Sequence, residues 1–207
     1  MAAKPRHFSM IREFHLADFF TLANAACGTA AIFLSMLYAA SETLTYFLFA
    51  TAMAPAAFIF DVFDGKIARA RNQHSSLGRE LDSLADVISF GVAPAAMGFA
   101  AGMQGGWDTV ILVYFVCCGV SRLARYNVTA EALSEGEAKV KYFEGTPIPT
   151  SVEIVGVLAY FAWDARIGEE LWGGAMALGP WVLHPLALIY AVSGSLMISK
   201  TLHIPKL

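Results

Sequence analysis

Six long apolar runs account for most of this 207-residue chain. They cover approximately residues 17–40, 43–70, 81–102, 107–126, 148–163 and 180–199. A helix needs about 20 mostly apolar residues to cross the hydrocarbon core of a bilayer. Six such helices and their short connections nearly exhaust the chain, which leaves no room for a second, soluble domain. The sequence therefore predicts an all-α integral membrane protein with six transmembrane helices in a single domain, residues 1–207.

The composition supports this class and excludes others. Apolar residues make up 57% of the chain and charged residues 15%, whereas soluble domains are about 45–50% apolar and about 25% charged. A disordered chain or a disulfide scaffold is excluded on the same grounds. The net charge of −3 offers no basic surface for nucleic acid. Cys27, Cys117 and Cys118 lie inside apolar runs without metal-ligand spacing, so we expect them to be small apolar fillers.

The first 15 residues differ from the runs that follow. Phe8, Ile11 and Phe14 recur at helical spacing among basic residues, a pattern that favours a short amphipathic helix on the membrane surface. An unstructured start is the alternative.

The distribution of positive charge predicts the orientation. With six spans, all of the 14 basic residues except Arg166 fall in the N-terminal arm, in residues 66–79 and 122–141, or in the C-terminal tail. The positive-inside rule then places both termini in the cytoplasm. The short chain favours a bacterial inner membrane over the endoplasmic reticulum.

Four carboxylates interrupt the second and third runs, where ionisable groups are costly and usually functional. Asp61 and Asp64 are spaced i, i+3, and Asp82 and Asp86 are spaced i, i+4, so each pair shares one helix face. Asp61 lies about 27 Å into its span, and Asp82 opens the next span from the same side. The four acids are therefore expected to meet at one depth, near the cytoplasmic ends of two neighbouring helices.

Four clustered carboxylates repel one another in a low dielectric unless some are protonated or cations lie among them. Hard divalent ions suit oxygen ligands, and shared carboxylates can bridge two metals. Gly65, Ala68 and Gly78 leave the nearby helix faces bare, and Lys66 and Arg69 add the positive charge that a polyphosphate site needs. The alternative is a set of structural salt bridges with the neighbouring basic residues. Nearby serines, Ser83 and Ser89, are expected to bond their own helix backbone.

The full pattern D-x2-D-G-x2-A-R-x8-G-x3-D-x3-D over residues 61–86 resembles the signature of the CDP-alcohol phosphatidyltransferases. Members of that family transfer a phosphatidyl or phospho-alcohol group from a CDP-linked donor and release CMP. The resemblance implies that Asp61, Asp64 and Asp82 ligate metal, and that Asp86 ligates a second metal and acts as the base. It also implies two Mg²⁺ or Mn²⁺ ions, a homodimer, and a CDP-lipid pocket formed by a wider set: Asn24, Asp61, Asp64, Gly65, Ala68, Arg69 and Gly78.

Two further segments bear on the acceptor. S-R-L-A-R-Y-N at 121–127 and Y-F-E-G-T-P-I-P-T at 142–150 resemble motifs of the phosphatidylserine synthases within that family. Asn24, followed by Cys27 and Gly28, resembles their first-span motif N-x-x-C-G. The implied substrates are CDP-diacylglycerol, from the surrounding membrane lipid, and L-serine.

The chemistry of serine agrees with these segments. Arg125 could bind the carboxylate of serine through both guanidinium N–H groups, with Arg122 on the same helix face, and Glu144 could face the serine ammonium. Alternatively, the arginines are ordinary anchors at an inner helix end, and Glu144 orders the loop at 127–147. His184 lies toward the outer side and is expected to be structural.

Two other functions stay open. The acceptor could be glycerol 3-phosphate, inositol phosphate or inositol, because two arginines would also suit a phosphorylated acceptor. A cation transporter would need polar residues through the depth of the membrane, whereas these acids cluster toward one face.

Overall fold

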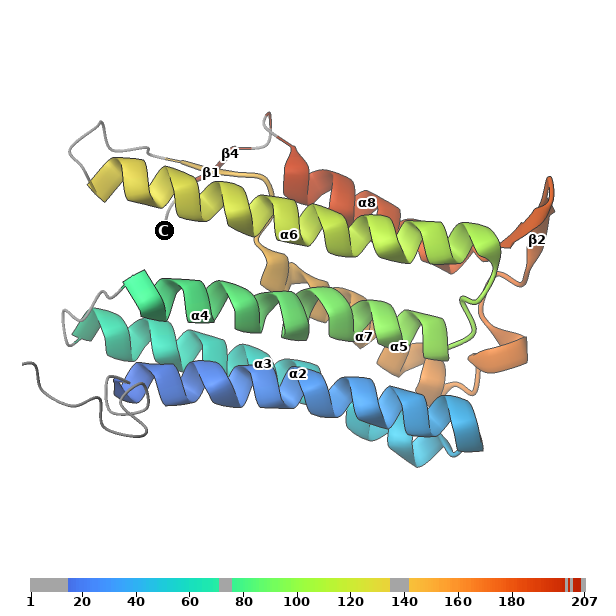
Figure 1. The fold of residues 1–207 in the computed structure, drawn as a ribbon. Helices are drawn as coiled ribbons and strands as arrows, with labels where there is room; N and C mark the ends of the chain where they lie inside the picture. The colour runs from blue at the N-terminus through green and yellow to red at the C-terminus, as the bar shows by residue number, and fades with distance from the viewer. Residues whose placement is uncertain (1–14, 71–75, 135–141, 200, 202, 206–207) are drawn as a thin grey trace, which may run out of the picture.

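The computed structural model describes residues 15–70, 76–134, 142–199, 201 and 203–205. The expected N-terminal surface helix lies outside the described residues, apart from His15. The described chain is an elongated bundle whose long helices run side by side (Figure 1).

Three long helical segments begin the bundle. They are α2 (Leu16–Ser41), α3 (Leu44–Ala70), and a continuous helix made of α4 (Ser76–Asp86), the π-helix η1 (Val87–Val92) and α5 (Ala93–Ala100). Helix α2 packs along α3 and also contacts α4, η1 and α5. The N-terminal ends of α2 and α4 and the C-terminal end of α3 lie at the same end of the bundle, on the left in Figure 1. We call this the site end.

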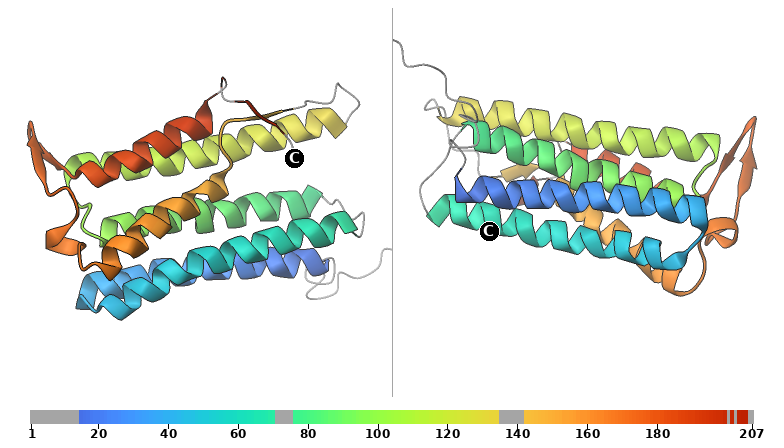
Figure 2. Two further views of the ribbon diagram at one scale, coloured as in Figure 1. Left: turned by 180° about the vertical axis from the view of Figure 1, so that it is seen from behind. Right: turned by 60° about the horizontal axis from the view of Figure 1, so that its bottom comes forward.

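The second half completes the bundle. Helix α6 (Gly106–Ser134) runs back to the site end, and β1 (Tyr142–Glu144) leads into η2 (Ile148–Thr150) and α7 (Ser151–Trp163). After η3 (Gly168–Glu170) and a hairpin, η4 (Pro185–Ala187) and α8 (Leu188–Ile198) return along α6 to β4 (His203–Pro205). The left view of Figure 2 shows α7 between the α6–α8 pair and the first three helices, and α7 contacts α3, α5 and α8.

Four helical stretches are long and apolar enough to cross a membrane: Leu16–Ser41, Leu44–Ile67, Leu77–Ala100 and Gly106–Thr129. The other two predicted spans contain shorter apolar helices, Ile148–Trp163 and Pro185–Ile198. The fifth predicted run, 148–163, is itself too short to cross as a full-length span, and in the sixth the strand β3 (Trp181–Leu183) replaces the first residues of the expected helix. The multi-pass membrane class therefore stands, while six full-length spanning helices are not established.

Two predicted boundaries are wrong. The loop expected at 127–147 begins as helix, because α6 continues to Ser134. Residues 127–134 contain no proline or glycine to stop a helix. The sixth run, expected from 180, starts as the strand β3 (Trp181–Leu183), and α8 begins only at Leu188.

Two small antiparallel sheets depart from the all-α expectation. In one, β1 pairs with β4 through Tyr142 opposite Pro205 and Glu144 opposite His203. In the other, β2 (Met176–Leu178) pairs with β3 through Met176 opposite Leu183. The first sheet therefore ties the chain ahead of α7 to the chain after α8.

Large aromatic side chains fill the core, where Phe47, Phe90, Phe115 and Tyr190 are fully buried. Other large apolar side chains point outward along the spanning helices, including Phe33 at 60% exposure. An outward apolar surface of this kind suits lipid rather than water.

Glycine lets two helices approach closely at one point. A Cβ added to Gly28 on α2 would lie 2.6 Å from the Cα and 2.5 Å from the Oγ of Ser89 on η1. Small residues permit such close contact between membrane helices.

We predict that Gly28→Ala lowers the free energy of unfolding by about 1–3 kcal/mol, because the new methyl group overlaps backbone that cannot move independently. Gly156→Ala is the matched control, since a Cβ there meets nothing within 4 Å and alanine favours a helix by about 1 kcal/mol. Unfolding in a denaturing detergent titration measures both variants. Equal stability of the two would contradict the close contact at Gly28.

Candidate active site

Three of the four predicted carboxylates meet at the site end. Asp61 and Asp64 come from the last turns of α3, and Asp82 comes from α4. One carboxylate oxygen from each lies within 4.8 Å of the others. Asp64 is buried, and the other two are half-buried. The predicted meeting of the two helices through their acids is confirmed for these three residues.

Asp86 lies one turn further along α4 and is 7% exposed. It stands outside the 4.8 Å group, but its carboxylate interacts electrostatically with Asp61, Asp64 and Asp82. Arg122 of α6 also interacts electrostatically with Asp86. Asp86 therefore lies between the carboxylate cluster and the helix that carries the predicted acceptor residues.

Helix α2 supplies polar partners to these acids. The Oγ1 of Thr21 donates a hydrogen bond to Oδ2 of Asp64 at 2.9 Å. The amide Nδ2 of Asn24 donates to Oδ1 of Asp86 at 3.3 Å. Thr21 and Asn24 are spaced i, i+3 and share a face. Asn24 was predicted and Thr21 was not, although its position one turn before Asn24 is a signal that could have found it.

Two buried oxygen atoms at this site have no hydrogen-bond partner among the described residues: Oδ1 of Asp82 and Oδ1 of Asn24. Buried acceptors without a donor are costly, and a cation would satisfy them. The cluster offers oxygen donors, which suit Mg²⁺ or Mn²⁺ better than softer metals. The residues present therefore fit a divalent metal ion.

The helix changes its winding directly after Asp86. Residues Val87–Val92 form a π-helical turn, and Pro94 follows at the start of α5. A proline has no N–H to donate and crowds the carbonyl four residues earlier, which is consistent with a widened turn here. Single π turns occur often at functional sites.

A hydrogen-bonded clamp links α4 to α6 near the acids. The Oγ of Ser83 accepts a hydrogen bond from Nδ2 of Asn127 at 3.0 Å and donates one to Oδ1 of Asn127 at 3.2 Å. The Nδ2 of Asn127 also lies 3.4 Å from both carboxylate oxygens of Glu80. Because α4 and α6 otherwise touch sparsely, this clamp helps to set their separation at the site end.

The expectation for the two serines is wrong. Ser83 bonds Asn127 rather than its own helix, and Ser89 donates to the backbone carbonyl of Asn24 at 2.8 Å. Helices α6 and α2 lie close enough to Ser83 on α4 and Ser89 on η1, respectively, to form these hydrogen bonds.

The remaining predicted residues lie on the expected elements. Arg122 and Arg125 are half-buried on α6. Gly65 leaves open space, since an added Cβ would meet nothing within 4 Å. Gly78 lies in the first turns of α4. The side chains of three others lie outside the described part of the structure: Ala68 and Arg69 on α3 and Glu144 on β1.

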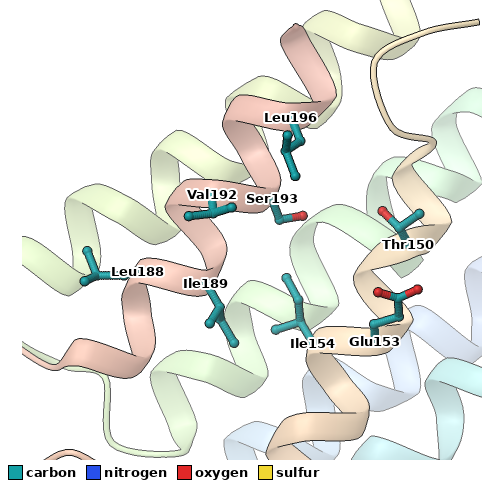
Figure 3. A pocket seen from close by; sticks show the side chains of 8 residues that line it. All are labelled: Thr150, Glu153, Ile154, Leu188, Ile189, Val192, Ser193 and Leu196. Carbon is teal, nitrogen blue, oxygen red and sulfur yellow. The ribbon is translucent and has the colours of Figure 1, made fainter. Parts of the chain in front are cut away.

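A cavity of about 370 Å³ lies elsewhere, between α7 and α8. Ile154 and Ile189 point toward each other across it (Figure 3). Its lining is mostly apolar and includes none of the predicted site residues. Because it carries neither the carboxylates nor the arginines, we do not assign the chemistry to it.

Comparison with known proteins agrees with the geometry. A sequence model of the CDP-alcohol phosphatidyltransferase family matches residues 14–192. The CDP-diacylglycerol–serine O-phosphatidyltransferase of Saccharomyces cerevisiae is 41% identical over 97% of this chain and 74% of its own length. Proteins of the same name from Bacillus subtilis and Mycobacterium tuberculosis are 33% and 37% identical, over 68% and 64% of this chain. The match spans 72% of the Bacillus protein and 46% of the mycobacterial one.

We predict that Ser83 and Asn127 are energetically coupled. A double-mutant cycle of Ser83→Ala and Asn127→Ala should give a coupling of about 0.5–1.5 kcal/mol, the usual net value of a hydrogen bond. Thr129→Ala is the control partner, because within the described chain the Thr129 hydroxyl donates to the Arg125 carbonyl of its own helix and not to α4. Unfolding free energies in mixed detergent measure the cycle. Additive effects of Ser83→Ala and Asn127→Ala would show that the clamp does not operate.

Proposed function

The chain belongs to the CDP-alcohol phosphatidyltransferase family, and from that premise we propose that it is a phosphatidylserine synthase. In this proposal it transfers the phosphatidyl group of CDP-diacylglycerol to the hydroxyl of L-serine. The products are phosphatidylserine and CMP.

The observation that carries the proposal is the meeting of Asp61, Asp64 and Asp82 within 4.8 Å, with Asp86 beside them. These are the aspartates of the family signature, and they lie at one end of an otherwise apolar bundle. A cation transporter is disfavoured because the described acids of the spans do not form a path across the membrane. The names of the relatives support serine as the acceptor.

Asp61, Asp64 and Asp82 would hold a divalent ion, Mg²⁺ or Mn²⁺, and Asp86 would contribute to a second one. Bound there, divalent ions offset the charge of the pyrophosphate and of the leaving CMP. Gly65 leaves room for the cytidine group, and Ala68, Arg69 and Gly78 complete that pocket by their positions in the signature. Asn24 joins the pocket from α2.

Asp86 accepts the proton of the serine hydroxyl as the serine oxygen forms a bond to the phosphorus of the diacylglycerol side. The bond from that phosphorus to the oxygen of CMP breaks at the same time. Asn24 orients Asp86 through its hydrogen bond. The guanidinium of Arg122 or Arg125 binds the serine carboxylate, and Glu144 faces the serine ammonium. Holding both substrates in line accounts for catalysis without a covalent enzyme intermediate.

We propose that the site end faces the cytoplasm, because nearly all the basic residues of the sequence flank it. CDP-diacylglycerol then enters sideways from the inner leaflet, and serine arrives from the cytoplasm. The outward apolar surface also leaves room for a homodimer.

The decisive experiment measures CMP release by the purified protein with CDP-diacylglycerol and Mg²⁺ or Mn²⁺. We expect release with L-serine and none with glycerol 3-phosphate, inositol phosphate or inositol. Release with one of the other acceptors instead would reject the serine assignment and keep the aspartate site. No release with any acceptor under either metal would reject the donor as well.

We predict that Asp86→Asn lowers kcat by about 100-fold or more, the usual contribution of a general base. Binding of CDP-diacylglycerol in the presence of metal should partly survive, because Asp61, Asp64 and Asp82 remain. Asp164→Asn is the matched control, since Asp164 pairs with Arg166 at the opposite end and should keep full turnover. An Asp86→Asn protein with near wild-type kcat would rule out the base assignment.

A further inference from the structure

The end of the bundle opposite the site carries a β-hairpin without a charged residue. Residues 171–183 are all apolar or glycine and proline, and they include both strands β2 and β3. Met176 and Leu178 on β2 are 53% and 52% exposed, and Trp181 on β3 is 47% exposed. The residues of both strands are mostly exposed, so apart from the side of the hairpin that packs on α6 the described chain offers it no cover.

The hairpin is held firmly on α6. The indole Nε1 of Trp107 donates a hydrogen bond to the Leu178 carbonyl at 2.9 Å, and the rings of Trp107 and Trp181 meet edge to face at 5.1 Å. A Cβ on Gly106 would lie 2.5 Å from the Trp181 ring. The apolar surface is therefore a fixed projection of the bundle.

A buried pair fixes the strand that leads back to α8. His184 contacts the carboxylate of Asp108 through Nδ1, and its backbone N–H donates to the other oxygen at 2.7 Å. Asp108 is fully buried and also accepts the N–H of Gly105 at 2.9 Å. The structural role expected for His184 agrees with these contacts.

All four tryptophans of the chain gather at this end: Trp107, Trp163, Trp172 and Trp181. Trp163, at the last residue of α7, is 82% exposed. Trp172 precedes β2 and stacks on Phe161 of α7 at 5.4 Å. Tryptophan is enriched where a bilayer meets water, because its ring is apolar and its N–H is polar.

We propose that the β2–β3 hairpin is a lipid-docking surface that lies in the membrane–water interface at the end opposite the carboxylates. Strand β3 packs on α6, where Val110 and Val113 are 48% and 57% exposed. The hairpin therefore adjoins the outward apolar surface of a spanning helix, which indicates lipid as the occupant. The hairpin has two strands only, so its outer edges leave backbone groups without sheet partners. Such groups are too costly in the hydrocarbon core, which restricts the hairpin to the interface.

The test uses the fluorescence of Trp181 alone, in lipid nanodiscs. Trp107→Phe, Trp163→Phe and Trp172→Phe are combined to give the single-tryptophan protein. We expect phospholipids brominated near the top of the acyl chain to remove the larger part of the Trp181 emission. Bromine near the chain ends and iodide in the water should each remove much less. A second single-tryptophan protein that retains Trp163 serves as the reference at the same end.

Every other pattern of quenching would overturn the proposal. Quenching mainly by iodide would place the hairpin in water, and quenching mainly by deep bromine would place it in the core. No quenching by either would show that protein, such as a second copy of this chain, covers it.

A charge on the hairpin gives an independent check. Leu178→Glu should shift the Trp181 emission to longer wavelength and reduce quenching by shallow bromine, because the carboxylate draws the hairpin toward water. Leu178→Val is the matched control and should behave like the parent. The hydrogen bond from Trp107 to the Leu178 carbonyl is absent from the parent and from both variants alike, because all three carry Trp107→Phe, so it does not distinguish them. Unchanged emission from Leu178→Glu would contradict contact with lipid.

Discussion

The bundle is organised around four carboxylates placed inside apolar helices. Asp61, Asp64, Asp82 and Asp86 repel one another in a low dielectric, so the surrounding helices must compensate for them. Helix α2 does so with Thr21 on Asp64 and Asn24 on Asp86. The remaining unpartnered oxygens suit a divalent ion. The packing of α2 against both α3 and α4 thus brings these two donors to the acids.

Much of this arrangement can be predicted from the sequence, because the strongest sequence signals are local. The spacing of Asp61 with Asp64, and of Asp82 with Asp86, places each pair on one face. An antiparallel turn then brings the pairs together. Apolar length likewise located the four long spans. Contacts between distant segments were harder to predict: the bonds from Thr21 to Asp64 and from Ser83 to Asn127 depend on how helices pack, which no local pattern encodes.

The strands were missed for a related reason. Trp181–Leu183 reads as an apolar run that could equally start a helix, and only pairing with β2 makes it a strand. Short apolar runs of this kind are ambiguous between strand and buried helix. The sequence pattern did not predict the extension of α6 to Ser134, because a polar stretch after a spanning helix has the composition of a loop. Polar residues can continue a helix beyond the bilayer when neither glycine nor proline interrupts it.

The π-helical turn at Val87–Val92 has a consequence for how the third membrane pass tolerates change. In a π-helix each N–H bonds a carbonyl five residues back rather than four, so this segment holds one more residue than an α-helical turn. Deleting one residue here would therefore restore α-helical winding with little change in the orientation of α5. Winding the same residues as a regular α-helix would instead rotate α5 by about 100° relative to Asp86. The Pro94 carbonyl would then turn away from the Tyr190 hydroxyl that it binds at 2.8 Å. The register between the half of this helix that carries Asp82 and Asp86 and the half that packs on Tyr190 is therefore set by the π-helical turn between them.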